Sequence, residues 1–87
     1  MKINPSFVAR NIAGELILVP TGPESAKAGL ITMNSVGAFI WSLLEKESEE
    51  KDILSAILDE YKVDEQTAKT DMDEFLAMLR TIGAIEA

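Results

Sequence analysis

The hydrophobic periodicity of the sequence changes near residue 34, and this change constrains the fold more than any other feature. Before residue 34, short runs of β-favouring residues alternate with turn-forming residues. After it, apolar residues recur at intervals of three and four, as in helices that bury one face. Strands followed by helices indicate an α+β domain whose helices cover one face of the sheet. A chain of 87 residues builds one small core, so we expect a single domain over residues 1–87.

The first third of the chain predicts three strands, at Phe7–Ala9, Leu16–Val19 and Leu30–Met33. Turn-forming residues from Asn11 to Gly14 separate the first two strands. The segment Pro20–Gly29 holds two prolines and two glycines, which indicate an exposed loop. Two successive hairpins give an antiparallel meander of three strands. The second strand is apolar on both faces, so we expect it to be central or covered.

The rest of the chain predicts three amphipathic helices. Asn34 or Ser35 provides the cap of the first, Ser48 of the second and Asp64 of the third, and we expect Gly83 to end the third helix. The single tryptophan, Trp41, is expected in the core, since large aromatic side chains dominate small cores. The apolar stripes are Val36, Phe39, Ile40, Leu43 and Leu44, then Ile53, Leu54, Ile57, Leu58 and Tyr61, then Ala68, Met72, Phe75, Leu76 and Leu79.

Charge is distributed unevenly along the chain. Residues 1–44 carry a net charge of +1, whereas residues 45–74 carry twelve acidic residues against four lysines, and the total is −7. Nucleic-acid binders need a basic stripe that displaces counterions, and this sequence has none. Met1 and Lys2 are followed by Asn4-Pro5 rather than by the apolar stretch of a signal peptide. The longest aliphatic run, Leu16–Val19, is too short to cross a bilayer. We expect a cytoplasmic, soluble protein that binds neither nucleic acid nor membrane.

The chain contains neither cysteine nor histidine. This absence removes thiolate nucleophiles, the commonest metal ligands and the commonest general base. Paired acids with helical spacing, such as Asp71 and Glu74, are typical of a solvated helix surface, where no pocket shifts a pKa. Ser25 and Lys27 form a conceivable nucleophilic pair, but nothing marks an oxyanion hole near them. We expect a binding module that is not an enzyme and holds no cofactor or metal.

The third predicted helix has a wider apolar band than its core stripe needs. On a helical wheel with Met72 at zero, Met78 and Ile82 fall near about 240° and 280°, beside Asp71 and Glu74. An apolar edge bordered by acids suits a groove for an apolar peptide segment that also carries a basic residue. The alternative is that the sheet or a second subunit covers Met78 and Ile82.

The third predicted strand, Leu30–Met33, lies at the edge of the meander. An open strand edge accepts an extended peptide as an additional strand. If the third helix lies beside this edge, strand and helix together form one peptide-binding trough.

The segment from Leu30 to Leu44, LITMNSVGAFIWSLL, resembles the core signature of the PqqD family, named for pyrroloquinoline quinone biosynthesis protein D. That signature runs hydrophobic-x-x-Leu-Asn-x-x-Gly-x-x-hydrophobic-Trp-x-x-Leu. Met33 stands where leucine is usual, and the Pro20–Gly29 loop is longer than in the archetypal protein. From Phe7 to Glu86 the resemblance covers nearly the whole chain, and it continues through Ile53-Leu54, Leu58, Tyr61–Asp64, Phe75-Leu76, Leu79 and Gly83–Ile85.

This resemblance implies a winged-helix-like fold, with a three-stranded antiparallel sheet followed by three helices. It also implies a non-catalytic adaptor that binds the leader segment of a ribosomally made precursor peptide. The adaptor presents that peptide to a modifying enzyme, often a radical S-adenosylmethionine protein. In the family the leader docks as an extra strand on the third strand, next to the third helix. The implied peptide-binding residues are Leu30, Ile31, Thr32, Met33, Asp71, Glu74, Phe75, Met78 and Ile82.

Two other functions remain open at this point. A winged-helix DNA-binding regulator has a related arrangement of helices, but residues 64–80 hold five acids and two bases, a charge that repels phosphate. A homodimeric structural subunit would place Met78 and Ile82 in a subunit interface. The resemblance to the broad family does not imply a role in making pyrroloquinoline quinone itself.

Overall fold

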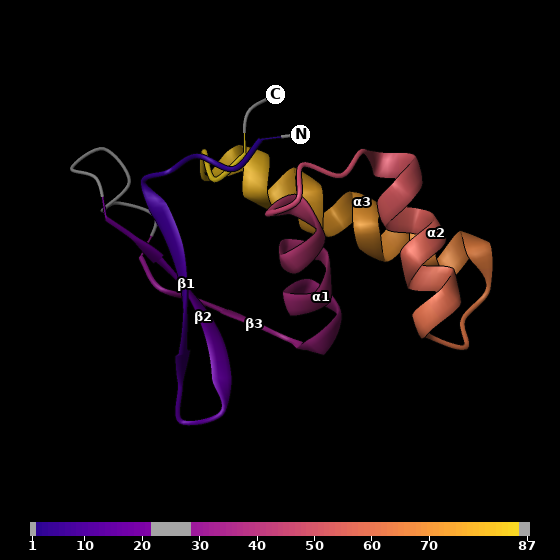
Figure 1. Ribbon diagram of the computed structural model, residues 1–87, viewed down its shortest axis with the longest axis horizontal. Helices are drawn as coiled ribbons and strands as arrows, with labels where there is room; N and C mark the ends of the chain where they lie inside the picture. Colours follow the sequence, from indigo (N-terminus) through magenta and orange to yellow (C-terminus); the bar gives the residue numbers. More distant parts are fainter. Residues whose placement is uncertain (1, 22–28, 86–87) are drawn as a thin grey trace.

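The computed structural model describes residues 2–21 and 29–85, in which three strands precede three helices. The strands form an antiparallel sheet in the order β1-β2-β3. The expected α+β fold is therefore confirmed. Figure 1 shows the sheet on one side of the molecule and the helices on the other, with α1 next to the end of β3. The elements are β1 (Phe7–Ile12), β2 (Glu15–Pro20), β3 (Ile31–Met33), α1 (Ser35–Leu44), α2 (Glu50–Glu60) and α3 (Glu65–Thr81).

The first hairpin is tighter than the sequence predicted. β1 and β2 pair from Phe7 opposite Pro20 to Ile12 opposite Glu15, so the turn consists of two residues. Ala13 and Gly14 have φ angles of 53° and 83°, and two positive φ angles are the requirement of a type I′ turn. The predicted turn is confirmed at Ala13 and Gly14, but its predicted bounds, residues 11–14, were too wide, because Asn11 and Ile12 belong to the ladder of β1.

The register of the strands gives the sheet one buried face. Leu18, in the central strand, pairs with Ala9 on one side and Ile31 on the other, and it is fully buried. Phe7 and Met33 lie on the same face, since residues two positions apart and residues paired across strands share a face. Both are also buried. This face packs on the helices, and the prediction that the second strand is central is confirmed.

The helices contribute most of the core. Trp41 is 2% exposed, which confirms its expected place in the core, although its Nε1 donor has no hydrogen-bond partner. The buried helical residues are Ile40, Trp41, Leu44, Ile53, Ile57, Ala68, Met72, Leu76 and Leu79.

Among the described residues, no helix is long and apolar enough to span a membrane. Part of the expected loop, residues 22–28, lies outside the described residues.

The helix starts follow the capping signals closely, with one correction. Asn34 is the N-cap of α1, and its Oδ1 accepts a hydrogen bond of 2.8 Å from the N–H of Gly37. Asp64 occupies the N-cap of α3, as expected. The cap of α2 is Glu49 rather than Ser48, and its N–H donates to the Asp52 carboxylate at 3.4 Å. An acid three residues after the cap favours that position for the helix start.

The end of α3 brings the two chain ends together. Gly83 has a φ of 79°, the N–H of Ala84 donates to the carbonyl of Leu79 at 2.8 Å, and the expected stop at Gly83 is confirmed. Ala84 and Ile85 then turn back into the core. Ile3 forms a bridge with Ile85, and the backbone N–H of Asn4 donates to the carbonyl of Ala84 at 2.8 Å.

The type I′ turn generates a stability prediction. An L-residue at positive φ carries a steric cost, and asparagine tolerates this conformation better than alanine. We expect Ala13→Asn to raise the free energy of unfolding by about 0.5–1 kcal/mol, measured by urea denaturation. Gly14→Ala is the matched control and should lower the free energy of unfolding. A gain from Gly14→Ala would contradict the assigned turn.

Candidate peptide-binding site

β3 has one paired edge and one open edge. Its three residues pair with β2, as Leu16 with Met33 and Leu18 with Ile31, and no strand among residues 2–21 and 29–85 pairs with the other edge. Ile31 is half-buried, Thr32 is exposed and Met33 is buried. The strand begins at Ile31, so the expected start at Leu30 was wrong by one residue. Leu30 precedes the strand and is 69% exposed.

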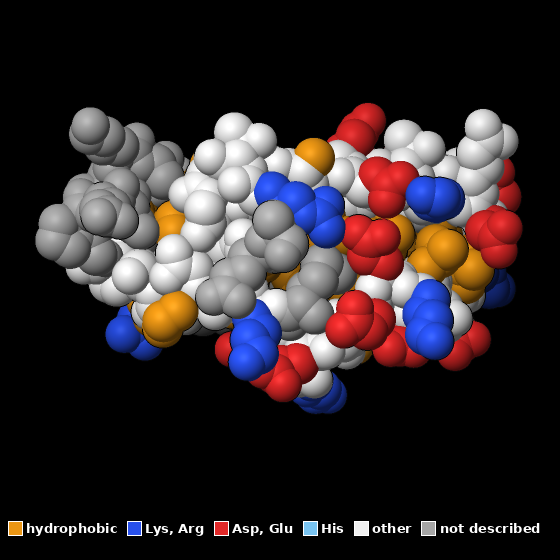
Figure 2. Space-filling view, turned by 90° about the horizontal axis from the view of Figure 1, so that it is seen from above, with side chains coloured by type: hydrophobic (Ala, Val, Ile, Leu, Met, Phe, Trp, Pro, Cys, Tyr) orange, Lys and Arg blue, Asp and Glu red, His pale blue; other side chains and the backbone are white. Residues whose placement is uncertain are grey.

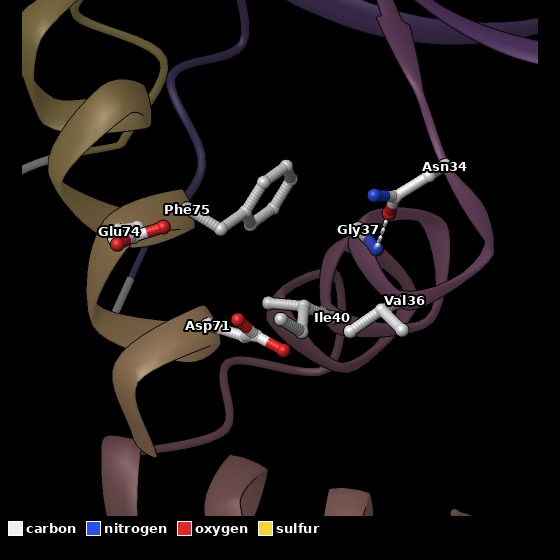
Figure 3. Close-up of a pocket in the computed structure, with 7 residues that line it drawn as sticks. All are labelled: Asn34, Val36, Gly37, Ile40, Asp71, Glu74 and Phe75. Atoms are coloured by element: carbon white, nitrogen blue, oxygen red, sulfur yellow. Dashed lines mark hydrogen bonds between the residues drawn. The ribbon is translucent and has the colours of Figure 1, made fainter. Parts of the chain in front are cut away.

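A hollow of about 340 Å³ lies between α1 and α3, and we call it the α1–α3 hollow. Its walls come from the first turns of α1 and the middle of α3. In Figure 3, Phe75 points from α3 toward Asn34 and Gly37, while Asp71 and Glu74 lie along the α3 side. Because Asn34 directly follows β3, the hollow begins where the strand ends. The lining residues are Asn34, Val36, Gly37, Ile40, Asp71, Glu74 and Phe75.

The structure brings together three of the α3 residues singled out from the sequence. Asp71 and Glu74 are exposed, and Phe75 is half-buried, at the side of the hollow rather than in the middle of the core. Met78 and Ile82 do not line the hollow. They are half-buried and pack against the core, so contacts within the chain already cover part of their apolar surface.

Two β3 residues from the same prediction line a second hollow. Thr32 and Met33 contribute to a space of about 680 Å³ between the β1–β2 hairpin and the start of α1. Leu16 and Ala38 line it as well, from the sheet and from α1 respectively. Asn34 lines both hollows, so both lie next to the strand-to-helix junction.

Gly37 explains why Phe75 lies so close to α1. A Cβ atom at this position would lie 3.0 Å from Cε1 of Phe75 and 3.3 Å from Oδ1 of Asn34. Both distances are shorter than ordinary van der Waals contact between such atoms. A glycine inside a helix costs about 1 kcal/mol relative to alanine, so its presence here calls for a packing reason. The ring of Phe75 fills the space that a side chain at residue 37 would occupy.

Negative charge dominates the helical half of the molecule. Figure 2 shows the acidic side chains mostly over the half that holds α2 and α3. The basic residues of α3 have acidic partners, since Lys69 pairs with Asp73 at 2.8 Å and Arg80 with Glu50 at 3.0 Å. The hydrogen bond that Lys69 donates to the Asp73 carboxylate raises the pKa of Lys69. The described residues contain no group of three potential metal ligands, and the pair Ser25 and Lys27 lies outside them.

Four lining residues were missing from the site predicted by sequence. Val36 and Ile40 were assigned to the apolar stripe of the first helix, and Asn34 was considered only as a cap. The spacing Asn34-x-x-Gly37 was the available signal, because a glycine in the first turn of a helix points to a close approach by another element.

The contact between Gly37 and Phe75 generates a prediction. Gly37→Ala normally stabilises a helix by about 1 kcal/mol. Here we expect a loss of about 1 kcal/mol in the free energy of unfolding, because the new methyl group forces the Phe75 ring to move. The double variant Gly37→Ala with Phe75→Leu should be more stable than Gly37→Ala alone. Urea denaturation measures the free energy of unfolding of the wild type, of Gly37→Ala and of the double variant. A Gly37→Ala variant more stable than the wild type would disprove the tight contact.

Comparisons with known proteins show which family and which solved structures this chain is similar to. The family model described as coenzyme PQQ synthesis protein D (PqqD) matches residues 18–85. The structure of TbiB1 in complex with the TbiA(beta) leader peptide has 32% sequence identity and a TM-score of 0.84, with 100% of this chain and 96% of that chain covered. Lasso peptide synthetase B1 complexed with the leader peptide has 16% identity and a TM-score of 0.77, with 92% of this chain and 89% of that chain covered.

The second of these structures shows the common fold alone, because its sequence identity is low. A search of curated proteins found no match. The family model spans most of the chain, and the similarity to TbiB1 covers all of this chain. The chain therefore belongs to the PqqD family.

Proposed function

We propose that this protein is a non-catalytic adaptor that binds the leader segment of a ribosomally made precursor peptide and presents it to a modifying enzyme. The observation that carries the proposal is an open β3 edge beside the α1–α3 hollow, in a chain similar over its full length to a leader-bound relative. The lack of a signal-peptide pattern after Met1 favours a cytoplasmic protein. In the family that the chain resembles, the modifying enzyme is often a radical S-adenosylmethionine protein.

Strand addition supplies the first part of the binding. A leader segment in extended conformation pairs with Ile31–Met33 through backbone hydrogen bonds, which are independent of the leader's side chains. A disordered peptide loses conformational entropy when it becomes ordered, and β3 is only three residues long. Backbone pairing alone is therefore too weak, and side-chain contacts must add to it.

The α1–α3 hollow supplies those contacts. Its apolar surface comes from Val36, Ile40 and Phe75, which suit an aliphatic or aromatic side chain of the leader. Asp71 and Glu74 lie on the α3 side and suit a neighbouring lysine or arginine. Pairs between exposed charges contribute about 0.2–1 kcal/mol each, so the carboxylates tune the affinity while the apolar contact dominates it.

Met78 and Ile82 have a smaller part in this proposal than in the sequence-based hypothesis. They follow Phe75 along α3 at spacings of three and four and extend the apolar row beyond the hollow. Their half-buried position leaves some surface for a leader. The homodimeric alternative was meant to explain what covers these two residues. Because both already contact the core, a second subunit is less necessary to cover them.

The acidic surface argues against the alternative of a DNA-binding regulator. Asp71 and Glu74 are exposed on α3, and negative charge on a recognition helix would repel phosphate. The absence of histidine and cysteine from the chain supports an adaptor rather than an enzyme.

Titration calorimetry against the leader peptides encoded beside this gene tests the function. We expect saturable binding to one of them at one-to-one stoichiometry. Asp71→Lys and Glu74→Lys should each weaken binding of a leader with a basic residue by about three- to tenfold, since each replaces attraction by repulsion. Added salt should reduce the difference in leader affinity between the wild type and these two variants, because salt screens the charges.

Asp59→Lys is the matched control, with the same change of charge at an exposed site on α2 that does not line the hollow. It should leave leader affinity within about twofold of the wild type. Equal losses for Asp59→Lys and Glu74→Lys would assign the effect to net charge and contradict the placement in the hollow. Absence of heat with every neighbouring leader would overturn the adaptor function.

Amide hydrogen exchange tests the strand addition separately. Leader binding should slow the hydrogen exchange of those amides within Ile31–Met33 that point to the open edge of β3. A new strand at this edge forms hydrogen bonds with backbone groups that otherwise face solvent. Amides of α2 should keep their exchange rates. Binding without any new protection in β3 would show that the leader does not pair with this edge.

A further inference from the structure

The sheet has a second face that the helices do not cover. The strand register places Val8 opposite Val19, Arg10 opposite Ile17, and Ile17 opposite Thr32, and directly paired residues share a face. These residues alternate with Phe7, Leu18 and Met33, which face the core. We call the set Val8, Arg10, Ile12, Glu15, Ile17, Val19 and Thr32 the outer sheet face.

The outer sheet face is more apolar than a water-facing sheet surface requires. An antiparallel sheet with one covered face normally presents polar residues on the other. Here the central strand contributes Ile17 and Val19, and β1 contributes Val8 and Ile12. Ile12 is 51% exposed, whereas Val8, Ile17 and Val19 are half-buried, and none of the four belongs to the core cluster or to the residues packed against it. Packing against the core therefore does not account for the apolar character of this face.

The charge of this face differs from that of the rest of the chain. Arg10 and Glu15 are its charged residues and they balance, whereas the acidic excess lies in residues 45–74 on the helical side. A partner for the outer sheet face is thus an apolar, nearly neutral protein surface. A second copy of this chain is disfavoured, since two molecules of charge −7 repel each other.

The outer sheet face is continuous with the proposed leader site. Thr32 belongs to β3, so a leader strand added to the open β3 edge would lie in the same sheet and extend both of its faces by one strand. Any protein seated on the outer sheet face next to β3 would then contact the leader as well. The enzyme that acts on the precursor peptide is the partner that must come this close to the leader.

We propose that the outer sheet face is the docking surface for the enzyme that modifies the precursor peptide. The proposal rests on the leader-binding function argued above. The enzyme contacts Val8, Ile17 and Val19 through an apolar surface and continues onto the leader strand. Leader and enzyme therefore bind with positive coupling, because the leader completes the surface that the enzyme recognises.

The test uses the purified modifying enzymes encoded beside this gene, titrated into the full-length chain with and without saturating leader. Ile12→Lys introduces a charge at an exposed edge of the face, and Ile17→Thr keeps the β-branched shape while it removes apolar surface. We expect each variant to weaken enzyme binding about tenfold and to leave leader affinity within about twofold. Wild-type binding to the enzyme should be tighter when the leader is present.

Val63→Lys is the matched control, because Val63 is a large hydrophobic residue, 41% exposed, that lies outside the sheet. It should bind enzyme and leader as the wild type does. Circular dichroism and urea denaturation verify that each variant is folded. Unchanged enzyme binding in both outer-face variants would overturn the docking surface, and so would a wild-type chain that binds leader but none of the enzymes.

Light scattering separates this proposal from self-association. A concentration-dependent dimer that Ile12→Lys and Ile17→Thr abolish would assign the outer sheet face to a second copy and overturn the proposal. The leader titration reports on the underlying function independently. A wild-type chain that binds no leader would contradict the adaptor role itself, whatever the enzymes do.

Discussion

The site depends on a direct junction between a strand and a helix. Met33 ends β3, Asn34 caps α1, and α1 begins at the next residue, so no loop separates the open strand edge from the first helical turn. The hydrogen bond from Gly37 to the Asn34 side chain fixes this junction. The same glycine leaves room for Phe75, so α3 approaches closely enough to form the opposite wall of the α1–α3 hollow. A single short segment thus positions both parts of the proposed leader site.

The rest of the core holds α1 and α3 in this relation. Trp41 and Ile40 anchor α1, while Leu76 and Leu79 anchor α3 in the same cluster. The edge-to-face contact of Phe39 with the Tyr61 ring, at 5.7 Å between centroids, adds a link from α1 to the end of α2. Binding sites supported by packed helices and a strand are positioned more precisely than sites on loops. A leader therefore meets a surface that is largely formed beforehand.

The sequence allowed correct prediction of features that local chemistry decides. Helical spacing located the three helices, and Gly83 marked the end of α3. The errors concern element boundaries. The start of β3 depends on pairing with β2, and the start of α2 depends on which of two neighbouring residues, Ser48 or Glu49, acts as the cap. The hollow was only partly predictable. The wheel identified Asp71 and Glu74, but it assigned Phe75 to the core stripe, since periodicity along one helix contains no information on how closely α1 approaches it.

The pairing of the chain ends has a consequence for how such a domain combines with others. Ile3 bridges Ile85, and Asn4 is hydrogen-bonded to Gly83 and Ala84, so entry and exit of the described chain lie side by side, as Figure 1 shows. A module whose ends meet can be spliced into a surface loop of a host protein without stretching either connection. Gene fusion can thus join this fold to a catalytic polypeptide as an insert as readily as at a terminus, while the sheet keeps its register.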